Sequence, residues 1–179
     1  EQWDFETIWT MEGDADYAYA ELRCFCPGGT VEISGLREDS LQGDRIYQDY
    51  FEALKKGSPT LDLRDCPDLG PVLMAMAGAL NGAILTGTRR LAIKESDRGR
   101  AMAEELAKFG ICVKVMENTI TVEAGKLKTP KEMLDSHHDH RIAMAFTIAS
   151  PDNRLDDPAC VAVSYPTFFE TLSSVSETN

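Results

Sequence analysis

The chain has 179 residues, 43% of them hydrophobic, which predicts one globular domain with a buried core. Its formal net charge of −12 disfavours nucleic acid and anionic membranes as partners. The longest apolar stretch, 72–80, is too short to cross a bilayer, and no basic and apolar leader opens the chain, so we expect neither a membrane span nor secretion. Five scattered cysteines without a Cys-x-x-Cys pair favour a reducing cytoplasm over a disulfide framework.

Short β-type runs alternate with helical runs along the chain, which predicts an α/β domain built from repeated units. The β-type runs are 5–10, 30–34, 60–63, 83–86, 111–116 and 119–123, and the last two should form a hairpin. Helices are expected to start at aspartates, because a carboxylate accepts a backbone N–H and complements the positive helix end. These starts are Asp14, Asp44, Asp68, Asp97 and Asp139, and a last helix is expected from about Pro166.

The helix expected from Asp68 differs from its neighbours because residues 72–80 are apolar on every side. Such a helix belongs inside the protein. The helices from Asp44 and Asp97 each have one apolar face and should end at Gly57 and Gly110. The sequence therefore predicts one central helix surrounded by amphipathic helices.

The densest charge cluster is 89–100, with five basic and two acidic residues. We expect Lys94 and Glu95 at the end of a strand, with Arg98 in the first turn of the next helix. A helix N-terminus favours anions, and a guanidinium binds carboxylate or phosphate through two parallel donors. An adjacent lysine and glutamate can supply a general acid and a base. The alternative is a solvated run of charges with ordinary helix capping.

A second cluster, 137–141, places three histidines, Asp139 and Arg141 before an apolar helix. Together with the first cluster it could hold two anionic groups of one small substrate. Metal binding is an alternative, but adjacent ligands rarely converge on one ion and no distant Cys or His pair completes the set. A helix cap with exposed histidines also stays open. Asp68 likewise has two interpretations, a plain N-cap or a carboxylate with one oxygen facing a substrate.

Several motifs occur in a characteristic order: Glu12-Gly13-Asp14, Ser40-Leu41-Gln42-Gly43-Asp44, Pro67-Asp68, Lys94-Glu95-Ser96-Asp97-Arg98, Asp139-His140-Arg141 and Ser164-Tyr165-Pro166. In this order they resemble the C-terminal half of the enolpyruvylshikimate-phosphate synthase family. The Lys-Glu-Ser-Asp-Arg and Asp-His-Arg blocks are the specific part of the likeness. The resemblance covers nearly all of the chain, whereas the family enzymes are more than twice as long.

The resemblance implies α/β units of the βαβαββ type with helices inside and sheets outside. Residues 1–179 would be a single C-terminal lobe without its N-terminal lobe. The family transfers the enolpyruvyl group of phosphoenolpyruvate to shikimate 3-phosphate and releases phosphate, without metal or organic cofactor. Its active site lies between two lobes, so the N-terminal lobe is an expected partner and this chain alone should be inactive.

The resemblance also implies roles for particular residues. Asp68 would hold the ring hydroxyls of shikimate 3-phosphate and take the proton of the attacking one. Lys94 and Glu95 would transfer protons at phosphoenolpyruvate. Arg98 and Arg141 would clamp phosphoenolpyruvate. His140, the last of the set, would orient this neighbourhood.

Two positions depart from the family pattern. Val163 stands where a lysine is frequent, and Ala92 where an arginine is frequent. The segments 48–65 and 151–157 are also shorter than usual. Two other functions therefore stay open: a lobe of the related enzyme that acts on UDP-N-acetylglucosamine, and a non-catalytic anion-binding module derived from the enzyme.

Overall fold

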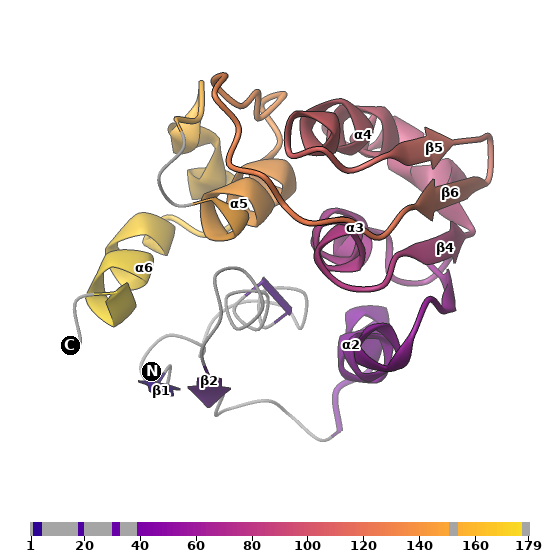
Figure 1. The fold of residues 1–179 in the computed structure, drawn as a ribbon. Helices are drawn as coiled ribbons and strands as arrows, with labels where there is room; N and C mark the ends of the chain where they lie inside the picture. The colour runs from indigo at the N-terminus through magenta and orange to yellow at the C-terminus, as the bar shows by residue number, and fades with distance from the viewer. Residues whose placement is uncertain (1, 5–17, 20–29, 33–38, 151–153, 177–179) are drawn as a thin grey trace.

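The computed structural model describes residues 2–4, 18–19, 30–32, 39–150 and 154–176 (Figure 1). The strands are β1 Gln2–Asp4, β2 Thr30–Glu32, β3 Thr60–Asp62, β4 Ala83–Thr86, β5 Val113–Val115 and β6 Thr119–Val122. The α-helices are α2 Tyr47–Lys56, α3 Gly70–Ala79, α4 Arg98–Lys108, α5 His140–Ala149 and α6 Phe168–Ser176. Within the described residues there are also four 3-10 helices: η2 Gly43–Ile46, η3 Pro67–Leu69, η4 Thr88–Ile93 and η5 Pro158–Val163. None of the helices in this described part is long and apolar enough to cross a membrane.

The main sheet has four strands in the order β3-β4-β6-β5. β3 and β4 run parallel, whereas β4, β6 and β5 pair antiparallel. The register places Leu61, Leu85 and Ile120 side by side, and all three are buried, while Ile84 points to the other, exposed face. One face of the sheet therefore packs on the core, because successive side chains of a strand point to opposite faces. The expected hairpin of β5 and β6 is confirmed, and the run 5–10 lies outside the described residues.

Helix α3 occupies the centre of the fold, as its apolar sequence predicts (Figure 1). It contacts α2, α4, α5, β4 and β6, and its residues from Gly70 to Gly78 are buried. Gly78 also permits close packing against the segment between α4 and β5, because a Cβ there would lie 3.0 Å from a side-chain carbon of Ile111. The sheet lies at the edge of this helical core. The mixed α/β class with an internal helix is thus confirmed.

The start of two helices follows the sequence prediction closely. Asp97 caps α4 and accepts a hydrogen bond from the Arg100 backbone N–H at 3.3 Å. Asp139 caps α5 and accepts from the Arg141 backbone N–H at 3.0 Å. The helix ends expected at Gly57 and Gly110 are also confirmed, because Gly57 is the C-terminal cap of α2 and Gly110 directly follows Phe109, the C-terminal cap of α4.

Two other predicted caps are wrong. Asp44 lies within η2 and Asp68 within η3, so neither carboxylate caps the α-helix that follows. Pro67 and Pro71 explain the second case, since they stand at the starts of η3 and α3 and bring no N–H that a cap would satisfy. The carboxylate of Asp68 is therefore available for other contacts. Asp14 lies outside the described residues.

Candidate active site

Arg98 is the centre of the candidate site. Its side chain is only 1% exposed, and its nitrogens donate to carboxylates from three different segments. Nε contacts Asp139 at 2.8 Å, Nη1 contacts Asp68 at 2.7 Å and Nη2 contacts Glu95 at 2.6 Å. Burial alone would lower the pKa of Arg98, but the hydrogen bond and charge of Asp139 outweigh it and raise that pKa, so the group stays charged.

Asp68 is shared between two cations. Besides Arg98, its Oδ1 atom lies 3.1 Å from Nζ of Lys94. Burial raises the pKa of Asp68, but the hydrogen bonds from Arg98 and Lys94 outweigh it and hold that pKa below its ordinary value. Asp68 is therefore a carboxylate at neutral pH, with an ammonium group beside it.

Asp139 and His140 lie at the N-terminus of α5, the positive end of the helix dipole. Asp139 is fully buried and accepts a further hydrogen bond from the hydroxyl of Ser96 at 2.8 Å, so all its contacts are internal. His140 is 7% exposed, and its Nδ1 lies 4.0 Å from Oε1 of Glu95. Burial, and then the charge of Arg141, lower the pKa of His140, which favours the neutral imidazole at pH 7.

Arg141 lies next to an aromatic ring that the sequence analysis missed. The guanidinium carbon of Arg141 is 5.5 Å from the ring centroid of Tyr19, and the two side chains are 8% and 1% exposed. The hydroxyl of Tyr19 donates to the backbone carbonyl of Asp68 at 3.4 Å. No sequence signal pointed to Tyr19, because it belongs to none of the motifs and its contacts lie far away along the chain.

The structure brings the predicted site residues into one cluster, which consists of Asp68, Lys94, Glu95, Arg98, His140 and Arg141. One local expectation is wrong: Lys94 and Glu95 follow the 3-10 helix η4 and not a strand. The six functional roles remain predictions. The donors of Arg98 in particular face carboxylates of the chain itself.

The two remaining histidines of the second cluster point elsewhere. His137 and His138 both have left-handed backbone angles, with φ of 52° and 54°, which is unusual outside glycine. Nδ1 of His138 lies 2.8 Å from Oδ2 of Asp157, and this carboxylate raises the pKa of His138. In the described part of the chain, no three His, Cys, Asp or Glu side chains are placed to hold a metal ion.

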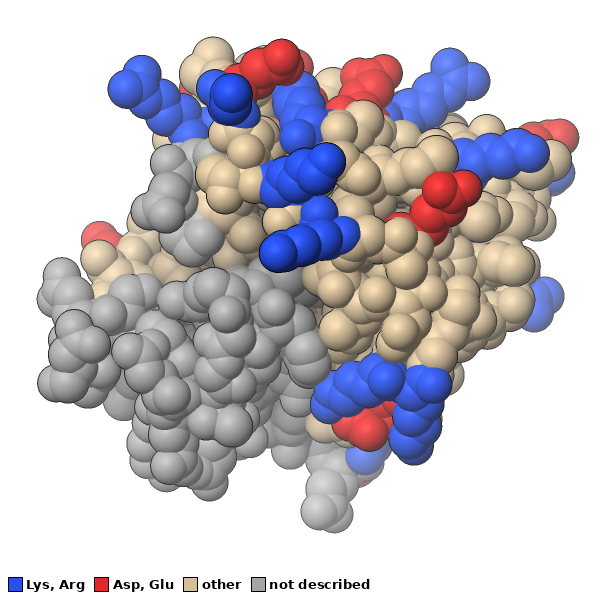
Figure 2. Space-filling model, in the orientation of Figure 1, with Lys and Arg blue, Asp and Glu red and all other residues tan. Residues whose placement is uncertain are grey.

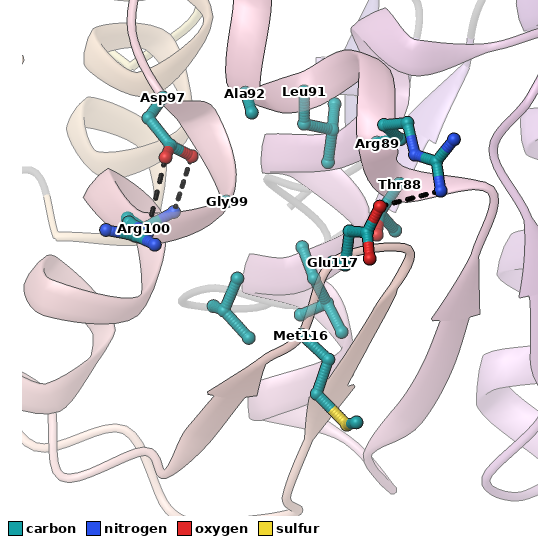
Figure 3. Close-up of a pocket in the computed structure, with 11 residues that line it drawn as sticks. Thr88, Arg89, Leu91, Ala92, Asp97, Gly99, Arg100, Met116 and Glu117 are labelled. Carbon is teal, nitrogen blue, oxygen red and sulfur yellow. Dashed lines mark hydrogen bonds and ion pairs between the residues drawn. The ribbon is translucent and has the colours of Figure 1, made fainter.

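A pocket of about 380 Å³ opens between η4, the start of α4 and the β5–β6 hairpin (Figure 3). Ion pairs stand at two sides of it, Asp97 with Arg100 and Arg89 with Glu117. Ala92 is also part of its lining, but none of the six clustered residues is. The pocket is therefore separate from the Arg98 cluster.

The surface charge is uneven. On the face that Figure 2 shows, Lys and Arg side chains dominate the charged surface of the described residues, although the whole chain carries −12. The side chain of Arg98 is not part of any such surface, because it is buried.

Comparison with known proteins shows the family of this chain. A sequence model of the EPSP synthase (3-phosphoshikimate 1-carboxyvinyltransferase) family matches residues 12–172. The 3-phosphoshikimate 1-carboxyvinyltransferase of Syntrophobacter fumaroxidans is 32% identical over 189 positions, which cover 93% of this chain and 45% of the relative. The enzyme of the same name from Clostridium acetobutylicum is 34% identical over 188 positions, covering 94% and 44%. The chain belongs to the EPSP synthase family, and it spans less than half the length of these relatives.

A solved structure supports the same assignment. EPSP synthase from Acinetobacter baumannii superposes with a TM-score of 0.55 and 31% sequence identity, covering 63% of this chain and 27% of that one. The sequence alignments of 188 and 189 positions are longer than the 179-residue chain, so the chain has gaps where these relatives have residues.

Proposed function

We propose that this chain supplies one lobe of an enzyme that transfers the enolpyruvyl group of phosphoenolpyruvate to shikimate 3-phosphate. The observation that carries the proposal is the network around Arg98, which joins Asp68, Lys94 and Glu95, the three groups that the family likeness assigns to proton transfer. The match to the EPSP synthase family favours shikimate 3-phosphate over the UDP sugar. The cytoplasmic location, like the single-lobe organisation, stays a prediction.

The reaction needs a base and an acid in close proximity. In the addition step, the attacking hydroxyl gives its proton to Asp68 while its oxygen bonds to the central carbon of phosphoenolpyruvate. Lys94 or Glu95 donates a proton to the methylene carbon, which gives a tetrahedral intermediate. In the elimination step the former methylene carbon, now a methyl group, gives up a proton, and the bond between the central carbon and the phosphate oxygen breaks. This step re-forms the enol double bond and releases phosphate. The contact of 3.1 Å between Lys94 and Asp68 supports this pairing of donor and acceptor.

The charge of the cluster supports a need for a second lobe. With His140 neutral, and with the buried Asp139 that contacts Arg98 counted alongside the cluster, three cations balance three carboxylates; these are Lys94, Arg98, Arg141, Asp68, Glu95 and Asp139. Both substrates carry several negative charges, so a balanced cluster attracts them weakly. We therefore infer that further positive charge comes from the complementary lobe.

The test is complementation. The chain is mixed with the separately expressed N-terminal lobe of its family, both substrates are added, and phosphate release is measured. We expect release only when both lobes are present, loss of release in Asp68→Ala, and normal release in Arg89→Ala, an arginine that is 70% exposed and outside the cluster. No release from two folded and associated lobes would contradict the proposal.

One observation favours a second candidate, a non-catalytic anion-binding module. Val163, where the family often has a lysine, is 78% exposed and apolar, so it offers no charge to a substrate. A module of this kind would bind phosphoenolpyruvate in the two-lobe mixture but release no phosphate. Restoring the charge with Val163→Lys should raise phosphate release if the chain is a lobe of the enzyme, and should leave it at zero if the chain is the module.

A further inference from the structure

The pocket between η4, the start of α4 and the β5–β6 hairpin has a largely apolar lining (Figure 3). Its large apolar residues are Leu91, Val115, Met116 and Ile120. Leu91 and Ile120 also belong to the buried core, whereas Met116 is 57% exposed. Apolar surface of this kind is stabilised when a ligand displaces water from it, and a volume of about 380 Å³ suits a small molecule.

Two small residues shape this pocket. A Cβ at Gly99 would lie 3.0 Å from Cδ1 of Ile120, so the start of α4 approaches the hairpin closely. Ala92 is part of the lining and stands where an arginine is frequent in the family. A short apolar side chain therefore replaces a long charged one at this wall.

The charged groups of the lining already have partners. Nε of Arg100 lies 3.4 Å from Oδ2 of Asp97, and Nη2 of Arg89 lies 2.8 Å from Oε1 of Glu117. These four are the charged residues of the lining, which is therefore neutral overall. An ion that entered the pocket would lose water and would have to separate one of these pairs to find a partner. The lining thus favours an uncharged ligand.

The hydroxyl of Thr88 is the polar group of this lining that lacks a partner. Thr88 is 4% exposed, and its Oγ1 atom has no hydrogen-bond partner. Buried polar groups are nearly always hydrogen-bonded, because an unpaired hydroxyl loses its water without compensation. The adjacent backbone N–H of Arg89 donates to Oδ1 of Asn118 at 3.2 Å, which ties this part of η4 to the hairpin. What the lining can offer a ligand is therefore one hydrogen bond beside an apolar surface.

We propose that this pocket binds an uncharged, largely apolar molecule the size of a single ring, whose hydroxyl or carbonyl group forms a hydrogen bond with Thr88. The apolar part of the ligand contacts Leu91 and Ile120. The site is separate from the Arg98 cluster, and the inference does not rest on the proposed function, because both substrates of that function are anions.

The first test titrates the whole chain with phenol and with toluene, which have nearly the same shape but differ in the hydroxyl. Thr88→Val should bind phenol about three- to tenfold more weakly than the wild type and toluene within about twofold, as expected for loss of one hydrogen bond. Thr121→Val is the matched control, because Thr121 pairs with Ile84 on β4 and is not part of the lining. It should change neither affinity. An equal change for both compounds in Thr88→Val would overturn the proposal.

Methyl NMR of the same samples locates the bound probe. The resonances of Leu91 and Ile120 should shift on addition of phenol, whereas that of Ile84, which is 41% exposed on the other face of the sheet, should not. Shifts at Ile84 as large as those at Ile120 would indicate adsorption to apolar surface and refute the site. An excess of phosphoenolpyruvate should leave phenol bound, and displacement would assign the binding to the Arg98 cluster instead.

Two further measurements separate the proposed contact from a structural role of Thr88. Without a ligand, Thr88→Val should unfold at the same urea concentration as the wild type or at a higher one, because an unpaired buried hydroxyl does not stabilise the fold. A lower midpoint would show that the hydroxyl already has a partner, and would sink the proposal. Benzoate and benzylammonium should bind more weakly than phenol, and tighter binding of either ion would contradict an uncharged ligand.

Discussion

Replacing Arg98 by leucine should destabilise the fold strongly. The substitution removes the cation that contacts three carboxylates, and one of them, Asp139, is fully buried. Its remaining contacts are the hydroxyl of Ser96 and the backbone N–H of Arg141, which cannot neutralise its charge. Asp68 and Glu95 are 34% and 43% exposed, so water can solvate them once the arginine is lost. The main penalty therefore comes from Asp139.

The magnitude follows from the burial of this pair. Removing one partner of a buried ion pair costs about 3–5 kcal/mol, because the other charge is left without compensation. Domains are typically stable by about 5–15 kcal/mol, so the loss takes a large share of the total. With a urea dependence of about 1–3 kcal/mol/M, the unfolding midpoint should fall by roughly 2 M.

Urea unfolding, followed by circular dichroism, measures this effect. The matched control is Arg100→Leu on the same helix, since Arg100 is 76% exposed and lies 3.4 Å from Asp97. An exposed pair contributes about 0–1 kcal/mol, so this variant should unfold close to the wild type. The reasoning would be refuted if Arg98→Leu and Arg100→Leu lowered the free energy of unfolding by the same amount.

Two further predictions concern titration and reactivity. Because Asp157 raises the pKa of His138, Asp157→Asn should return that pKa toward 6.5, as measured by an NMR titration. In the wild type the ion pair stabilises the fold below about pH 6.5. This stabilisation disappears as the pH rises through the raised pKa of His138. An unchanged titration would contradict the assigned partner. Burial raises the pKa of the Cys66 thiol to about 12, so a thiol reagent at pH 8 should modify the exposed Cys112 first. Peptide mapping by mass spectrometry measures how much of Cys66 and of Cys112 is modified. Equal labelling of the two thiols would show that Cys66 is accessible and would contradict the prediction.

The features that the sequence predicted correctly depend on neighbouring residues. The caps at Asp97 and Asp139 each use a backbone N–H two or three positions away. The burial of α3 follows from its uniformly apolar composition. Local rules of this kind were enough to define the helices, most strands and the two charged helix starts.

The features that the sequence did not predict depend on contacts between distant segments. Arg98 and Asp139 are 41 positions apart, and Arg98 and Asp68 are 30 apart, so no spacing rule joins them. From the sequence, Arg98 is expected to bind an anion at a helix N-terminus, whereas the fold buries it among carboxylates. Tyr19 is a further case, since only the packing of the folded chain brings its ring to Arg141.

The exposure of the three carboxylates indicates how Arg98 could still bind a substrate under the proposed function. Asp139 is buried and holds Nε, so it anchors the guanidinium in the fold. The two terminal nitrogens face Asp68 and Glu95, which are more exposed and can be solvated at little cost. A substrate carboxylate could therefore replace Glu95 at Nη2 while the anchor to Asp139 stays intact. In that exchange Glu95 would leave the guanidinium and face phosphoenolpyruvate, where proton transfer requires an acid or a base.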